Sequence, residues 1–117
     1  MATNSTDCTP NDIQLVEMLV LKLSTLEKID EVSRFLKIIS DPTRIKIILL
    51  LENNEVSVND IAVSMNMTKS AVSHQLKLLK ENGYIKDRKE GKNKFYSIYD
   101  NHIMEIIHSA YTHIRHC

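Results

Sequence analysis

Two short segments with helical periodicity, separated by a tight turn, constrain this chain more than any other feature. Residues 57–83 read SVNDIAVSMNMTKSAVSHQLKLLKENG. Ser57 and Asp60 form a capping pattern that opens a helix to about Met65, and Thr68 opens a second helix that the closing Asn-Gly pair ends. Two short helices joined in this way predict a helix-turn-helix.

The second of these helices has two chemically different faces. At about 100° per residue, one side gathers apolar side chains, which are Val72, Leu76 and Leu79. The opposite side carries only hydrogen-bonding side chains, among them Ser70, His74 and Lys77. The apolar side is expected to pack inward, which leaves the polar side for a partner.

A basic hairpin is expected directly after the second helix. Residues 84–99, YIKDRKEGKNKFYSIY, alternate apolar and polar side chains on both sides of KEGKNK. With only two glycines and two prolines, the rest of the chain favours helices. The predicted fold class is therefore mostly α (α+β): a winged helix-turn-helix with a two-stranded β-hairpin wing.

The net charge of the chain is zero, but the charges are unevenly distributed. Residues 69–94 carry eight basic and three acidic side chains, whereas residues 1–68 carry six and ten. A local positive charge on a helix that fits the major groove predicts binding to double-stranded DNA. The expected DNA-binding residues are Lys69, Ser70, Ser73, His74, Gln75, Lys77, Arg88, Lys89, Lys92 and Lys94.

Helices are also predicted on both sides of this region. Apolar spacing indicates helices over residues 12–26, 28–39 and 100–115, and Asp41 with Pro42 begins another. The buried side of that helix is expected to be Ile45, Ile48, Leu49 and Leu51. We expect a disordered arm over residues 1–11 and one domain over residues 12–117. No apolar run is long enough to span a membrane, and no signal peptide is evident. A cytoplasmic protein without a membrane partner is therefore expected.

Three stretches together resemble the ArsR/SmtB family of bacterial metal-sensing repressors. They are FLKIISDPTRIKIILLL, VNDIA and SAVSHQLKLLKENGYIKDRKEGKNKFYSI, and the resemblance covers about residues 30–117. It implies a homodimer formed largely by the first and last helices, which binds operator DNA until an inducer, commonly a metal ion, binds. It implies neither enzymatic activity nor an organic substrate.

The last predicted helix carries side chains of the types that zinc takes as ligands: Asp100, His102, His113 and His116. His113 and His116 can share one ion, but His102 lies about 16 Å before His113 along a helix axis. If two last helices pack antiparallel, the first pair of one copy meets the second pair of the other, which gives two equivalent sites. The family's zinc sensors carry Asp-x-His and His-x-x-His at this separation. We therefore expect release from the operator by zinc or cobalt, with nickel as a further candidate.

Other interpretations remain open. Relatives that sense soft metals use cysteines near the start of the helix-turn-helix, where this chain has Ser57 and Asn59. A metal-independent or thiol-responsive repressor could use Cys8 and Cys117. A zinc hydrolase is a weaker alternative, because it needs an open coordination position and a pocket. His108 matches no ligand position and is expected at the dimer interface or the surface.

Overall fold

The computed structural model describes residues 6–115, and its contacts divide the chain into a unit that ends at Val32 and a unit that begins at Ser33. The first unit contains helix α1 (Ile13–Thr25), and helix α2 (Ile29–Ile38) spans the boundary. Residues 1–5 of the predicted arm lie outside the described residues. Residues 6–12 form neither helix nor strand, and the disorder of the arm stays a prediction.

Helix α1 begins where the sequence indicated, but it contributes no residue to a buried core. The Asp12 carboxylate caps it by accepting a hydrogen bond of 3.1 Å from the N–H of Leu15. None of its residues is buried. Its exposed large apolar side chains are Ile13, Leu15, Met18, Leu19, Val20, Leu21 and Leu23. An apolar surface of this extent is typical of a helix that packs against a further protein surface.

The second unit holds the hydrophobic core. Its further helices are α3 (Pro42–Leu50), α4 (Val58–Met65), α5 (Lys69–Glu81) and α6 (His102–Arg115). Side chains from all four meet in the core, and the fully buried ones are Ile47, Ile48, Leu51, Ile61, Val72, Leu76, Leu79 and Ile85. The three apolar residues predicted to face inward from α5 are all in this set. For α3 the prediction was partly wrong, because Ile47 is buried whereas Ile45 and Leu49 are only half-buried.

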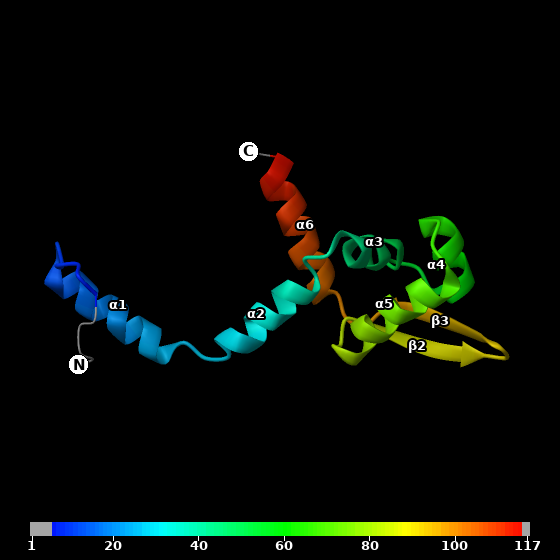
Figure 1. Cartoon of the computed structure of the whole chain (residues 1–117), viewed down its shortest axis with the longest axis horizontal. Helices are drawn as coiled ribbons and strands as arrows, with labels where there is room; N and C mark the ends of the chain where they lie inside the picture. Colours follow the sequence, from blue (N-terminus) through cyan, green and yellow to red (C-terminus); the bar gives the residue numbers. More distant parts are fainter. Residues whose placement is uncertain (1–5, 116–117) are drawn as a thin grey trace. The chain divides into compact units, whose positions relative to one another are not determined.

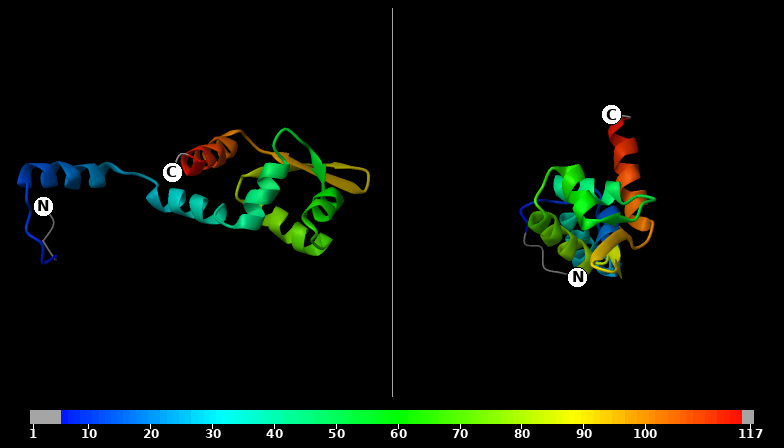
Figure 2. Two further views of the ribbon diagram at one scale, coloured as in Figure 1. Left: turned by 90° about the horizontal axis from the view of Figure 1, so that it is seen from above. Right: turned by 90° about the vertical axis from the view of Figure 1, so that its right-hand side faces the viewer.

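A small antiparallel sheet completes this unit. Strands β2 (Ile85–Glu90) and β3 (Asn93–Ile98) form the hairpin, and the two-residue strand β1 (Val56–Ser57) pairs with the other edge of β3. Figure 1 shows the hairpin beside α4 and α5. Figure 2 shows the chain passing from β3 through a short orange segment into α6. The mostly α winged helix-turn-helix is thus confirmed.

The hairpin is tighter than the sequence indicated. Only Gly91 and Lys92 lie between the strands, and Gly91 has a positive φ of 63°. Glycine adopts this angle without strain at the first position of a two-residue hairpin turn. The strands therefore extend into the predicted loop. Strand β1 was not predicted, because two residues are too few to show alternation. No described helix has the length and apolar character needed to cross a membrane.

Candidate functional sites

The turn between α4 and α5 sets where the second helix begins. Asn66 ends α4 in a left-handed conformation, with φ of 54°, and the Thr68 hydroxyl accepts a hydrogen bond of 3.1 Å from the N–H of Ala71. One helix therefore stops and the next starts within three residues. The first N–H groups of α5 have no partner within the helix, which suits this end to a nearby phosphate.

The polar face of α5 is exposed over most of its predicted contacts. These exposed residues are Lys69, Ser70, Ser73, His74 and Lys77. Ser70, His74 and Lys77 lie opposite the buried apolar residues, and Lys69 and Ser73 lie at the edge of this face. The core therefore holds the helix while this face remains accessible. The face presents ammonium, hydroxyl and imidazole groups, which can bond to base edges and phosphates.

Gln75 is placed differently from the other predicted contacts on α5. It is half-buried and lies about 100° around the helix from His74, and its Oε1 accepts a hydrogen bond of 3.0 Å from Nε of Arg44 on α3. No local sequence pattern indicates this contact, because the two residues lie 31 positions apart.

A groove with a volume of about 690 Å³ lies between α5 and the hairpin, which we call the wing. Its lining includes six lysines, which are Lys69, Lys77, Lys80, Lys89, Lys92 and Lys94. Only two carboxylates, those of Glu81 and Asp87, lie among its lining residues. The excess of positive charge makes the groove suitable for a polyanion such as a phosphate backbone.

Asp87 partly neutralises this positive charge. Its side chain is only 16% exposed, and Lys80 Nζ lies 3.0 Å and Lys94 Nζ 3.8 Å from its carboxylate oxygens. Burial, followed by the charge of Asp87, raises the pKa of the neighbouring Tyr96. Asp87 thus links the end of α5 to both strands of the wing.

The side chains of the wing strands alternate between its two faces, so its cations lie on different faces. Lys89 pairs with Lys94 across the strands, and both line the groove, while Lys92 lies in the turn. Arg88 pairs with Phe95, and neither of these two residues lines the groove. Because successive side chains of a strand point to opposite faces, Arg88 lies on the other face of the wing.

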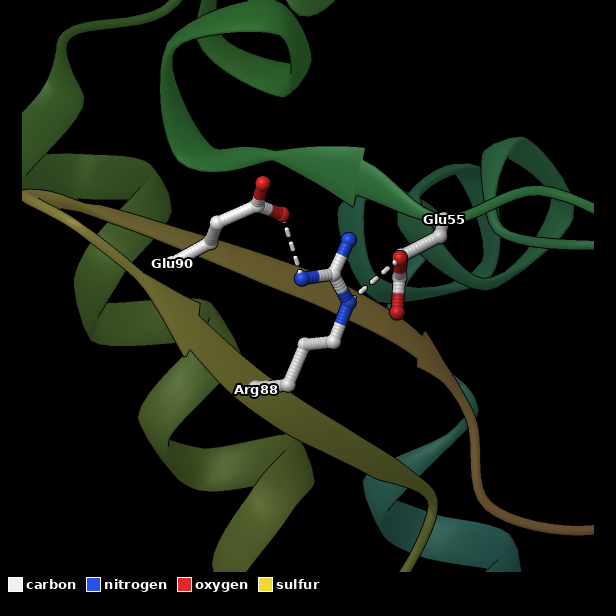
Figure 3. Close-up of polar contacts among 3 residues, drawn as sticks. All are labelled: Glu55, Arg88 and Glu90. Atoms are coloured by element: carbon white, nitrogen blue, oxygen red, sulfur yellow. Dashed lines mark hydrogen bonds and ion pairs between the residues drawn. The ribbon is translucent and has the colours of Figure 1, made fainter.

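Arg88 is already engaged within the chain (Figure 3). Its Nε lies 2.7 Å from Glu55 Oε1, its Nη1 lies 2.6 Å from Glu90 Oε2, and its guanidinium carbon lies 4.9 Å from the centre of the Phe95 ring. Hydrogen bonds to Glu90 and then Glu55 raise the pKa of Arg88. Glu90 follows two positions after Arg88, on the same strand face, and this signal was present in the sequence. The role of Arg88 in DNA binding stays a prediction.

The predicted metal ligands lie at the two ends of α6. At its start, Asp100 Oδ1 accepts a hydrogen bond of 3.0 Å from the N–H of His102 and lies 3.1 Å from His102 Nδ1. His113 lies in the last turn of the helix, and His116 lies outside the described residues. Over residues 6–115 of one chain, no three His, Cys, Asp or Glu side chains are grouped so that they could hold a metal ion.

The remaining histidine of α6 has a partner of its own. His108 Nε2 lies 2.6 Å from Oε2 of Glu52, the second residue after α3, and both residues line a pocket of about 350 Å³. This contact joins α6 to the α3 end of the core. Of the two cysteines considered for a thiol response, Cys8 is exposed and Cys117 lies outside the described residues.

Comparisons with known proteins agree with this geometry. The model of the bacterial regulatory protein arsR family matches residues 41–87, from the start of α3 to the middle of β2. A transcriptional repressor SmtB homolog from Synechocystis sp. is 30% identical over 88% of this chain and 78% of its own length. A cadmium resistance transcriptional regulatory protein CadC homolog from Staphylococcus aureus is 38% identical over 73% of this chain and 71% of its own.

A solved structure shows the same fold. It is the solution structure of a homodimeric winged helix-turn-helix DNA-binding domain from Mycobacterium bovis, described as a possible ArsR-family regulator. It matches with a TM-score of 0.68 at 26% identity, over 76% of this chain and 85% of its own length. Fold, exposed polar helix and relatives agree that the chain is a DNA-binding regulator of transcription and not an enzyme, and it belongs to the bacterial arsR family of regulatory proteins.

Proposed function

We propose that two copies of this chain form a repressor that binds operator DNA through α5 and the wing, and that zinc or cobalt bound at α6 releases it. The single observation that carries the metal part is the separation of the donors. Asp100 and His102 stand together at the start of α6, while His113 stands in its last turn. One chain therefore offers two half-sites rather than one complete site.

The DNA-binding part assigns different roles to the two groups of cations. The exposed face of α5, with Ser70, Ser73 and His74, would contact base edges in the major groove. The groove lysines, including Lys89, Lys92 and Lys94, would neutralise phosphates and supply affinity without sequence preference. Arg88 would contribute less, because two carboxylates already share its charge.

The homodimer is supported by apolar surface that one chain leaves exposed. Helix α1 buries none of its residues, and on α6 the side chains of Ile106, Tyr111 and Ile114 are exposed. A twofold pair of copies would cover these surfaces with each other. The related domain from Mycobacterium bovis is itself homodimeric.

The donor set fits a divalent ion of borderline softness. Imidazole and carboxylate suit zinc and cobalt, and the ligands assigned are Asp100 and His102 of one copy with His113 and His116 of the other. When bound, the ion would supply one bond to each of four donors and so restrain the two copies of α6 relative to each other. Asp100 holds the His102 ring in place through its contact with Nδ1.

A chain of hydrogen bonds connects the start of α6 with the end of α5. Tyr84 follows α5, and its N–H donates to Leu79 O at 3.0 Å. Its carbonyl accepts a hydrogen bond of 3.1 Å from the N–H of Tyr99, the residue before Asp100. Its hydroxyl donates to Phe35 O at 2.9 Å. A shift at Asp100 would therefore reach α5 through Tyr84.

Mixed dimers test the proposal. One subunit carries Asp100→Ala with His102→Ala, and the other carries His113→Ala with His116→Ala. Each homodimer has two ligands per site and should bind zinc poorly, whereas the mixed dimer has one complete site and should bind about one zinc tightly. Anisotropy of labelled operator DNA should show that zinc releases the parent. No tight zinc in a verified mixed dimer would overturn the shared site, and unchanged DNA affinity with zinc would overturn the sensing role.

A further inference from the structure

We propose that Arg44 is a positioning residue for DNA recognition, which fixes the amide of Gln75 so that α5 offers hydrogen-bond donors to a base at this position. The inference rests on the proposed contact between α5 and the major groove. The observation behind it is the hydrogen bond of 3.0 Å from Arg44 Nε to Gln75 Oε1.

Arg44 is held on both sides of this contact. Its Nη1 donates to the carbonyl of Ile38, the last residue of α2, at 2.9 Å. Its backbone N–H donates to Oδ2 of Asp41, the capping residue of α3, at 3.1 Å. The whole residue is half-buried. The guanidinium therefore has a fixed place next to the flank of α5.

A guanidinium can only donate hydrogen bonds, so it decides which atom of Gln75 faces it. The oxygen of the amide must turn toward Arg44, and the NH₂ group occupies the other arm of the planar amide. An unrestrained glutamine would exchange these two atoms by rotation. Arg44 removes that freedom, so the other arm of the Gln75 amide offers only donors.

The fixed orientation has a consequence for base preference. A freely rotating glutamine pairs with adenine by donating to N7 and accepting from the N6 amino group. With Oε1 turned toward Arg44, Gln75 is best matched by guanine, whose major-groove edge presents the acceptors N7 and O6. Without Arg44, the same glutamine should favour adenine.

The test selects bound sequences from a library of randomised DNA duplexes, with the parent dimer and its variants. Gln75→Ala should lose a guanine preference at one position of each half-site. Arg44→Met should change that same position toward adenine by roughly tenfold. Lys46→Met removes a charge from an exposed residue of α3, the helix that also carries Arg44, and should leave the base preference at every position unchanged. Thermal midpoints and dimer mass verify that each variant is folded.

A second variant keeps the test valid if Arg44→Met fails to fold. Gln75→Glu retains a partner for Arg44 but replaces the donor by an acceptor, so the preferred base should become cytosine, whose N4 group donates. A retained guanine preference in this variant would overturn the proposal, as would an Arg44→Met variant that selects the parent sequence.

The same experiment separates this inference from the proposed function. If Gln75→Ala leaves the base preference at every position unchanged while His74→Ala alters it, α5 recognises DNA but Gln75 does not. The inference about Arg44 then fails, and the proposed function stands. If neither changes any position, the proposed recognition by α5 fails as well.

Discussion

The ammonium group of Lys80 lies 3.0 Å from the carboxylate of Asp87, which ties the last turn of α5 to the wing and also lies near Lys94. Asp87 therefore offsets two lysines in the proposed phosphate groove. Asp87→Asn should strengthen binding to random-sequence DNA and make log Kd about one unit steeper in log salt, because each further phosphate contact adds about 0.9. Anisotropy of a labelled random duplex over a salt series measures both effects.

A matched control removes the same charge elsewhere. Glu105 lies on α6 and does not line the groove, so Glu105→Gln should leave the salt slope unchanged. If both variants raise DNA affinity equally, net charge rather than the placement of Asp87 explains the gain. The lost ion pair with partly exposed Lys80 should cost less than about 1 kcal/mol of unfolding free energy.

The cations of the wing should differ in their importance. Replacing both Lys92 and Lys94 by Ala should weaken operator and random DNA alike and lower the salt slope by about two units. Arg88→Ala should change the slope much less, because Glu55 and Glu90 already hold its guanidinium. A slope lowered by about one unit in Arg88→Ala would show that Arg88 leaves its carboxylates to contact DNA.

The helices of this chain could be predicted closely because their signals are local. Asp41, Ser57 and Thr68 were predicted as caps from the sequence, and each accepts the expected backbone hydrogen bond. A capping residue acts within three positions of itself. The strand pairing of β1 and the contact between Arg44 and Gln75 depend on residues far apart in sequence, and no local pattern encodes them.

The candidate sites divide in the same way. Periodicity was sufficient to place Ser70 and His74 on the exposed face of α5, because one helix defines that face. It could not show that Arg88 lies opposite the groove, since this depends on where the short turn at Gly91 sets the register of the wing. For the metal ligands, the structure places Asp100 and His102 at the start of α6 and His113 in its last turn. A site that combines both ends requires a second copy and stays a prediction.

Tyr84 connects α5, α6 and α2, and its loss should affect stability. Tyr84→Phe removes the hydroxyl that donates to Phe35 O and should lower the free energy of unfolding by about 1 kcal/mol. Tyr99→Phe, at an exposed tyrosine, should change it little. Denaturant unfolding at neutral pH measures the difference, and equal losses would contradict a special role for the Tyr84 hydroxyl.

The same side chain should produce a pH dependence. Burial raises the pKa of Tyr84, so the unfolded chain releases this proton first as the pH rises. Its contribution to stability is therefore complete below about pH 10 and is lost as the pH rises through the folded pKa. The thermal midpoint of the parent should fall more steeply above about pH 10 than that of Tyr84→Phe. Parallel curves would show that the phenol does not contribute.

Two histidines of α6 provide a matched test of the metal site. His102 contacts Asp100 at the start of the helix, whereas His108 contacts Glu52 near the end of α3. His102→Ala should weaken zinc binding by about a hundredfold or more, because changes to the mere partners of a ligand already cost about 10- to 100-fold. It should still bind operator DNA, since α5 and the groove are unchanged.

The control variant His108→Ala should bind zinc with the affinity and stoichiometry of the parent. Zinc titration by calorimetry, paired with operator anisotropy, measures both properties. If His108→Ala loses zinc while His102→Ala keeps it, the ion binds near Glu52 rather than between the ends of two α6 helices.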